Sequence, residues 1–495
     1  MSHVASVVSL LLSALGIGLL VNQPVYVSPT LGVAELGLSI RLDALSVLMF
    51  TMINLIAFVV LRFSQTYLDG DERQGLFLGK LAATIASVQL LVIAGNLGLL
   101  FIAWVLTSYF LHALLKFYPH RQKAIIAARK KFIAARLSDG FLLIAVIGLY
   151  FHFGTGDLGS IMAAVQENAV SAGPPLVELS AACIALSALM KSAQFPLHAW
   201  LIEVMETPTP VSALLHAGLL NAGPFLVARL AFVVTAAEFA AVLLVVLGGF
   251  TALFGTLSYL TQTSVKTALG YSSISHMGFS LLMCGLGLYP AAMLHMVAHS
   301  FYKAHAFLSS GSAVETLVGS RVALPGTANS GTFIKVLSSM VLAFAMFGGL
   351  SFAFGINPMQ EESMLFISAV IVMGLSMLFM PVLRSGAGFP AVLRTAVVAA
   401  AVTASFWILE NGIALLMGAA LPPVVQPSVL LTILASLLLL LFLLVIFIQM
   451  AGFLTPAAPF WRKMAIHFRN GLYANAWSDR TVRAAYVKAQ EAERR

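Results

Sequence analysis

The sequence has little charge and almost no cysteine. Charged residues make up 9% of its 495 residues, and 60% of the residues are hydrophobic. Soluble proteins contain about 25% charged residues. A soluble domain of this size cannot bury so many apolar side chains, so the composition excludes a soluble enzyme and a disordered chain. The two cysteines, Cys183 and Cys284, have no CxxC partner, which excludes a cysteine metal site and a disulfide framework.

Long apolar runs are what the chain has in abundance. A helix needs about 20 mostly apolar residues to cross a membrane. The runs show no two-residue alternation, so the sequence predicts an all-α polytopic membrane protein. We count about 14 spans, near residues 2–21, 44–63, 76–95, 97–117, 137–154, 177–196, 210–233, 237–260, 266–289, 290–318, 332–354, 362–383, 391–418 and 427–452.

Basic residues gather on one side of the expected membrane. The loop 116–136 and the tail 453–495 are rich in Lys and Arg, whereas the loops 22–43, 155–176 and 355–361 together hold a single basic residue. By the positive-inside rule, this asymmetry places both termini in the cytoplasm. The formal net charge of +8 is therefore interpreted as an orientation signal.

The chain divides into two expected parts. Residues 1–454 form a transmembrane domain, and residues 455–495 form a basic, amphipathic cytoplasmic tail. Aromatic residues such as Trp461 and Tyr473 stand among Arg and Lys in this tail, a pattern typical of a helix lying at the membrane interface. The tail is either a simple basic anchor or a docking segment for a partner.

Lys191 begins the first group of candidate ion-pathway residues. An ionisable residue inside a span costs about 2.5–3.5 kcal/mol on insertion scales and therefore indicates function. Pro196 follows closely and breaks the helix, which frees carbonyl groups beside the ammonium. The acidic residues Glu203 and Glu206 come next. The alternative is a lysine whose stem reaches to the membrane surface.

The span 290–318 contains the second group. His295, His299 and Lys303 follow one another at intervals of four residues, so they share one helix face. Imidazoles titrate near neutral pH, and a column of them is suited to passing protons. A zinc site is the rival interpretation, but no carboxylate or thiol nearby completes it. We therefore favour a relay and predict no metal site.

The third group consists of scattered polar residues in or near other spans. Lys266 and His276 belong to the span 266–289, and Lys266 lies near enough to the cytoplasmic end for its stem to reach water. His216, Asp139 and Glu410 extend the polar thread. Together the three groups predict a broken polar axis through the protein.

Several of these residues belong to longer motifs. The motifs are KSAQFPLHAW at 191–200, PTPVSALLH at 208–216, VKTALGYSSISHMG at 265–278 and HMVAHSFYK at 295–303. They resemble the antiporter-like subunits of respiratory complex I and of multisubunit antiporters. The resemblance implies two inverted five-helix repeats, each with a broken helix. It also implies a central proton path through Lys191, Lys266, His295, His299 and Lys303.

Two departures separate this chain from the proton-pumping members. Their paired glutamate follows a tryptophan, whereas here Trp104 is followed by Val105, so this partner of Lys191 is missing. Their second lysine is also absent, and the segment 355–362 offers carboxylates in its place. The segments 117–123 and 215–229 instead resemble the DabB branch of the family.

Members of that branch are membrane subunits of inorganic-carbon accumulation complexes. The resemblance implies an ion-conducting subunit of a bacterial inner membrane that passes H⁺ or Na⁺ and catalyses no reaction itself. It implies no cofactor in this chain, membrane lipids around it, no nucleic acid and a large zinc-binding DabA-like partner that resembles β-type carbonic anhydrases. The alternatives are a proton-translocating subunit of an NADH–quinone oxidoreductase or hydrogenase, a subunit of a multisubunit Na⁺/H⁺ antiporter, and a membrane scaffold without transport.

Overall fold

The protein is a multi-pass helical membrane protein, as the apolar runs predict. The computed structural model describes residues 2–33, 35–167, 174–311, 332–355, 362–418, 420–423, 426–451, 459–476 and 478–480. Within these residues, eleven helices are long and apolar enough to cross a membrane.

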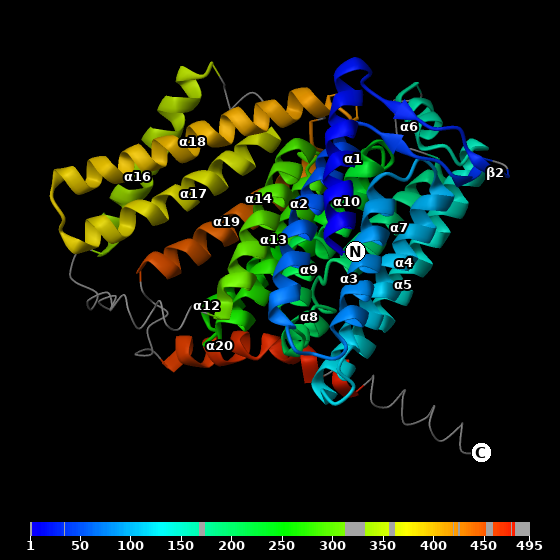
Figure 1. The fold of residues 1–495 in the computed structure, drawn as a ribbon. Helices are drawn as coiled ribbons and strands as arrows, with labels where there is room; N and C mark the ends of the chain where they lie inside the picture. Colours follow the sequence, from blue (N-terminus) through cyan, green and yellow to red (C-terminus); the bar gives the residue numbers. More distant parts are fainter. Residues whose placement is uncertain are drawn as a thin grey trace.

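The long helices stand side by side in one bundle, and α16 to α19 lie along one flank of it (Figure 1). Short 3-10 helices are labelled η. In chain order, the elements are α1 (Ser2–Asn22), β1 (Tyr26–Val27), β2 (Leu31–Val33), β3 (Leu36–Leu38), β4 (Arg41–Leu42), α2 (Ala44–Tyr67), α3 (Gln74–Val92), α4 (Leu97–Leu115), α5 (Gln122–Phe153), α6 (Leu158–Glu167), α7 (Pro175–Lys191), α8 (Ala199–Glu203), η1 (Val204–Glu206), α9 (Thr209–Ala217), η2 (Leu219–Asn221), α10 (Ala222–Arg229), α11 (Ala231–Thr235), α12 (Glu238–Leu260), α13 (Val265–Gly285), α14 (Tyr289–Leu308), η3 (Ser309–Gly311), α16 (Thr332–Ala353), α17 (Glu362–Ser385), α18 (Phe389–Met417), α19 (Val429–Ala451), α20 (Pro459–Arg469) and η4 (Gly471–Tyr473).

The expected total of 14 spans stays a prediction. The helices α7, α13 and α14 lie where the three remaining apolar runs were expected. Helix α7 has only 17 residues, and α13 and α14 carry the histidines and lysines of the candidate pathway. Part of the candidate pathway therefore lies on helices that least resemble ordinary membrane spans, whereas Asp139, His216 and Glu410 lie on helices that do resemble them.

Two helix breaks face each other in the middle of the bundle. Helix α7 ends at Lys191, five residues before Pro196. The span expected near 210–233 is not one uninterrupted helix, because α9 and α10 are separated by η2. Pro224 has no amide hydrogen for the carbonyl four residues earlier, that of Leu220. This carbonyl accepts a hydrogen bond from the Ser192 hydroxyl at 2.8 Å, which joins the two breaks.

Helices α12 and α13 pack with their backbones in close contact. A Cβ atom on Gly248 would lie 2.7 Å from the carbonyl oxygen of Gly278, and one on Gly278 would lie 2.6 Å from that of Gly248. Small residues allow this approach inside membranes. The contact fixes the position of α13, which carries His276.

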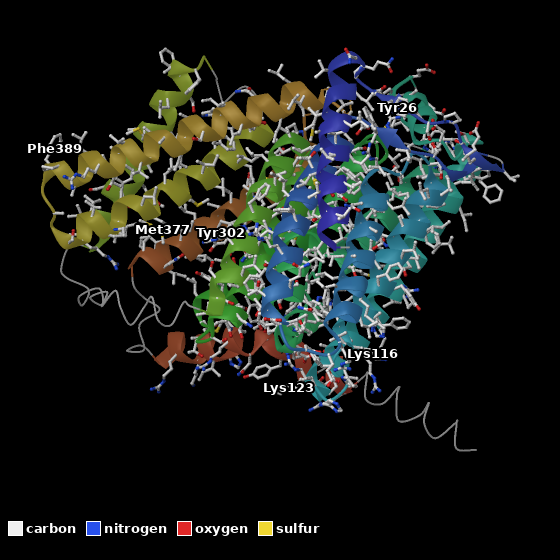
Figure 2. The ribbon with its side chains drawn as sticks, viewed as in Figure 1. Tyr26, Lys116, Lys123, Tyr302, Met377 and Phe389 are labelled. Carbon is white, nitrogen blue, oxygen red and sulfur yellow. The ribbon has the colours of Figure 1, made fainter. Side chains whose placement is uncertain are left out.

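The two ends of the bundle differ in charge. Figure 2 shows Lys116 and Lys123 at the end where α20 lies, called here the α20 end, and Tyr26 at the opposite end. The strand pairs β1–β4 and β2–β3 belong to that opposite end (Figure 1). The basic loop and the start of the basic tail therefore lie together, as the charge pattern predicts.

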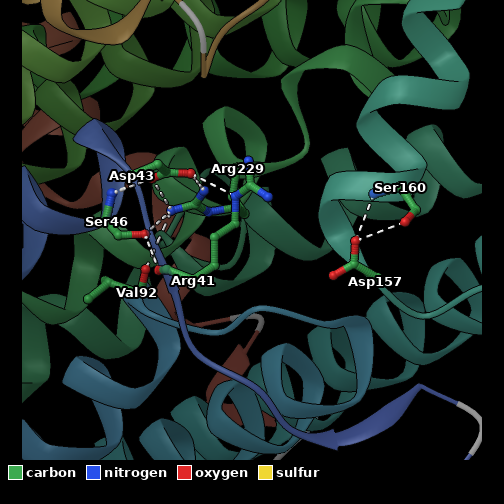
Figure 3. A network of polar contacts seen from close by, with 7 residues as sticks. All are labelled: Arg41, Asp43, Ser46, Val92, Asp157, Ser160 and Arg229. Carbon is green, nitrogen blue, oxygen red and sulfur yellow. Dashed lines mark hydrogen bonds and ion pairs between the residues drawn. The ribbon is translucent and has the colours of Figure 1, made fainter. Parts of the chain in front are cut away.

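A fully buried ion pair ties α10 to the start of α2 (Figure 3). Arg229 donates two hydrogen bonds to the Asp43 carboxylate, at 2.6 and 3.1 Å, and a third to the Ser46 hydroxyl at 2.6 Å. Asp43 also accepts a hydrogen bond from Arg41 at 2.9 Å and caps α2 through the Ser46 amide. One carboxylate thus holds two arginines and a helix end.

Replacing Arg229 is expected to destabilise the bundle strongly. Breaking a buried ion pair costs about 3–5 kcal/mol because it leaves the other charge buried without compensation. We expect Arg229→Met to lower the melting temperature of the detergent-solubilised protein. Arg462→Met, at an exposed position on α20, serves as the control and should leave it unchanged. Equal melting temperatures for the two variants would contradict this account.

Candidate ion pathway

Lys191 is held by one turn of α4. Its ammonium donates hydrogen bonds to the Trp104 carbonyl oxygen at 2.7 Å and to the Ser108 hydroxyl at 2.6 Å. The ammonium also lies 4.2 Å from the centre of the Trp104 ring, close enough for a cation–π interaction. Lys191 therefore bonds to groups inside the bundle and is not a lysine that only reaches for water.

Helix α5 supplies the other charges around Lys191. Asp139 forms an ion pair with Arg136 at 2.6 Å and interacts electrostatically with Lys191. Lys131, on the same helix, donates a hydrogen bond to the Ser108 carbonyl oxygen at 2.8 Å. The structure therefore places Asp139 and a second lysine, Lys131, in the surroundings of Lys191.

Glu203 belongs to a cluster at the α20 end. Lys130 lies 2.6 Å from a Glu203 oxygen and 2.6 Å from an oxygen of Asp479. Burial raises the pKa of the Glu203 carboxyl, and the hydrogen bond from Lys130 opposes that shift. Glu206 ends η1, but its side chain lies outside the described residues, so its pairing with Glu203 stays a prediction.

The described part of the tail packs onto the bundle around this cluster. Helix α20 lies across the ends of the long helices (Figure 1), and the Gln262 side chain donates to the Arg469 carbonyl oxygen at 3.3 Å. Gly471 follows with φ of +58°, and a Cβ atom there would lie 2.6 Å from the Tyr271 hydroxyl. Only glycine fits this contact without displacing Tyr271.

Three histidines from α13 and α14 meet in a second cluster. The Nδ1 atom of His276 lies 3.1 Å from the Nε2 atom of His295, which is hydrogen-bond distance. The ring of His299 lies 4.9 Å from that of His276, centre to centre. The four-residue spacing on α14 and the packing of α13 against it therefore bring together three imidazoles that the sequence singles out.

These imidazoles line an open pocket of about 520 Å³. Hydroxyl groups of Thr256, Ser272 and Ser275 line it too, and Tyr302, which is exposed, lies at its edge (Figure 2). Such a polar pocket has room for several water molecules. Water and imidazoles together are suited to carrying protons to and from the surface.

Lys303 and His216 continue the histidine cluster into the bundle. Lys303 is fully buried, and its ammonium donates a hydrogen bond to the Leu269 carbonyl oxygen at 3.0 Å. The ring of His216 stacks on Phe307 at 4.4 Å between centres. Within the described residues, neither ring nitrogen of His216 or of His299 has a hydrogen-bond partner. In each neutral ring, one of these nitrogens is therefore available to accept a proton, and both can form hydrogen bonds with water.

Two predicted residues remain, Lys266 and Glu410. Lys266 lies at the start of α13 and donates a hydrogen bond to the Thr209 hydroxyl at 3.1 Å. Glu410 is buried on α18, a helix that packs against α14. The polar thread thus has two clusters, one of lysines and carboxylates and one of histidines with Lys303.

Comparisons with known proteins identify the family. Residues 94–324 match the transmembrane region of the NADH:quinone oxidoreductase/Mrp antiporter family, and residues 30–78 match the N-terminus of complex I chain 5. The chain is 35% identical, over 454 residues, to the probable inorganic carbon transporter subunit DabB2 of Halothiobacillus neapolitanus, covering 91% of this chain and 81% of that one. The chain belongs to the DabB branch of the complex I and Mrp antiporter-like family.

Other relatives of this family match a shorter part of the chain. The chain is 41% identical over 287 residues to the probable inorganic carbon transporter subunit DabB of Hydrogenovibrio crunogenus, and these are 58% of this chain and 55% of that one. It is 35% identical over 292 residues to NAD(P)H-quinone oxidoreductase chain 5 of Synechocystis, covering 43% of that protein. The chain thus spans about half the length of these two relatives or less.

Solved structures share the fold. The Mrp complex from Dietzia superposes with a TM-score of 0.64 at 23% identity, covering 98% of this chain and 57% of that one. The membrane-bound sulfane sulfur reductase, an archaeal respiratory complex, superposes with a TM-score of 0.58 at 19% identity, covering 96% and 93%. The antiporter-like helical fold expected from the sequence motifs is confirmed.

Sequence reasoning missed several residues that surround Lys191 and Glu203. Lys130 and Lys131 belong to a run of basic residues that is interpreted only as an orientation signal. Ser108 and the Trp104 carbonyl carry no charge, and Asp479 lies in the tail, far from Glu203 along the chain. The sequence offers one signal that Lys130 and Lys131 are buried, which is their position directly before an apolar span. The positive-inside rule alone does not require basic residues to lie so close to a span.

We expect Asp479→Asn to loosen the tail from the bundle. A hydrogen bond to a charged group contributes about 1.5–3 kcal/mol, and more exposed ion pairs contribute less. Hydrogen exchange of residues 474–476 should therefore accelerate by about threefold to tenfold. Arg480→Gln, at the next position, which is exposed, should leave the exchange rate as it is. Unchanged exchange in Asp479→Asn would show that Lys130 does not hold the tail.

Proposed function

We propose that this chain is the ion-conducting subunit of an energy-coupled inorganic-carbon uptake complex. The observation that supports this proposal most directly is the identity to a DabB subunit along nine-tenths of the chain. The two clusters support an ion pathway, because buried lysines and histidines inside membrane helices are otherwise costly. H⁺ or Na⁺ enters down its gradient, and its passage drives CO2 hydration or bicarbonate delivery by the partner.

The proposed route begins at the histidine pocket. A proton from the outer side reaches His295 and His299 through the pocket and passes to Lys303 by way of His276. From there it travels past Lys266 to Lys191, and then to Glu203 and Glu206. The cluster at the α20 end is the last step of the route, because Lys130 pairs both with Glu203 and with Asp479 of the tail. The chain itself performs no covalent chemistry in this scheme.

The partner belongs at the α20 end in this proposal. The basic loop and tail give that end its positive charge, which supports a position on the cytoplasmic side of a bacterial inner membrane, with both termini in the cytoplasm. A large DabA-like subunit, with zinc and a β-carbonic-anhydrase-like fold, would dock there. A change of charge at Glu203 and Lys130 lies within reach of the tail and of anything bound to it.

Complementation tests the proposal. We expect this chain and a DabA-like zinc-binding partner, expressed together, to rescue growth in air of a bacterium that lacks carbonic anhydrase. Lys191→Ala should abolish rescue, because it removes the cation held by α4, and an uncoupler should do the same. Lys116→Ala, at the exposed α20 end, is the matched control and should rescue like the unchanged chain.

The outcomes separate the proposal from its rivals. If the well-expressed pair fails to rescue, the chain belongs with the respiratory or Na⁺/H⁺ antiporter subunits. If Lys191→Ala rescues fully, the chain is a scaffold without transport.

The purified chain alone tests the division of labour. We expect it to show no carbonic anhydrase activity, because the hydration chemistry is assigned to the partner. The assay is the rate of acidification by CO2-saturated water, with and without the partner. Robust activity of this chain by itself would contradict the assignment.

A further inference from the structure

Lys131 is a buried lysine that the proposed pathway does not use. It is 4% exposed, and its ammonium donates to the carbonyl oxygen of Ser108 at 2.8 Å. The Lys191 ammonium donates to the hydroxyl of the same residue at 2.6 Å. Two ammonium groups, from α5 and α7, therefore meet at a single residue of α4.

The charges around this pair do not balance. Among the residues the structure describes, Asp139 is the carboxylate that interacts electrostatically with both lysines, and it is already paired with Arg136 at 2.6 Å. His112, on α4, also faces Lys131 electrostatically. On α8, Glu203 is bonded to Lys130 instead. Lys131, Lys191 and the exposed Arg136 thus share one carboxylate, and excess charge is costly around the buried Lys131.

Like charges placed this closely cannot both be carried at low cost. Two neighbouring carboxylates share one proton for this reason, and the same argument applies to two amines. The glutamate that the family places after the tryptophan is missing here, so Lys191 has no dedicated carboxylate on α4. A second cation, Lys131, bonds instead to the same residue of α4, Ser108.

We propose that Lys131 is a positioning residue for ion transfer, whose positive charge repels the proton on Lys191 and promotes its onward release. This inference rests on the proposed function in that Lys191 carries the ion. Asp139 is shared with Arg136 and does not balance both lysines, so a proton arriving at Lys191 is held only weakly. A partner carboxylate would control by attraction how readily Lys191 gains or loses a proton. Lys131 controls the same property by repulsion.

A structural role for Lys131 makes a different prediction. Its hydrogen bond to Ser108 joins α5 to α4, and this alone would explain its burial. Lys131→Gln keeps a hydrogen-bond donor but removes the charge, whereas Lys131→Arg keeps a permanent charge. If the role of Lys131 is structural, the protonation of Lys191 should be the same in both variants. If Lys131 acts by repulsion, the protonation of Lys191 should differ between them.

The experiment measures the charge state of Lys191 directly in membranes that hold the chain with its partner. Acetic anhydride acylates only neutral amines, so the extent of Lys191 labelling against pH, read by mass spectrometry, reports its protonation. We expect Lys131→Gln to move the labelling midpoint to higher pH by about one unit. Lys131→Arg should leave it unchanged or lower it, and Lys116→Gln should match the original chain.

The labelling is independent of transport, so the two proposals fail separately. An unchanged midpoint in Lys131→Gln, with an unchanged melting temperature, would overturn the role of Lys131 while carbon uptake still stands. Lys131→Met serves as the second variant if the Gln variant is unstable, with the same expected direction. Failure of complementation together with a shifted midpoint would overturn carbon uptake and leave the lysine pair in place.

Discussion

A single turn of α4 provides the interaction on which the lysine cluster depends. The membrane interior supplies no water to solvate an ammonium, so Lys191 must find acceptors within the bundle. It finds them in the Trp104 carbonyl and the Ser108 hydroxyl, because α7 ends at Lys191. Ser192, the next residue, bonds to the free Leu220 carbonyl and anchors the end of α7 on the second broken helix. The unbroken helix α4 therefore supplies the acceptors for Lys191, and the carbonyl freed at the second break binds Ser192 and not an ammonium group.

The histidine cluster is subject to the same constraint, a membrane interior without water, but meets it in a different way. Its rings meet one another and an open polar pocket, whereas Lys303 is fully enclosed and bonded to a carbonyl. Neutral imidazoles cost much less to bury than ammonium groups, so they can stand without a full set of partners. The two kinds of side chain thus differ: the histidines line a pocket with room for water, whereas Lys191 and Lys303 are each held by hydrogen bonds.

How much of this arrangement the sequence predicts depends on how far apart along the chain the interacting residues lie. The intervals between His295, His299 and Lys303 are local and place these residues along one side of α14, as expected. Motif similarity correctly indicates the antiporter-like fold. The encounter of Lys131 with Ser108, and of Asp479 with Lys130, depends on how distant helices pack, which neither periodicity nor charge counts reveal. The sequence does contain a sign of the break in the span at 210–233, because Pro224 has no amide hydrogen to donate to the Leu220 carbonyl.

The pair of Asp43 and Arg229 has a consequence for biosynthesis. The two residues are 186 positions apart, so the ribosome makes Asp43 long before its partner. At about 5–20 residues per second, the delay is roughly 10–40 s. During this time Arg41 is the arginine available to balance the carboxylate at the start of α2. The ion pair that fixes the start of α2 is therefore completed only after α10 has been made.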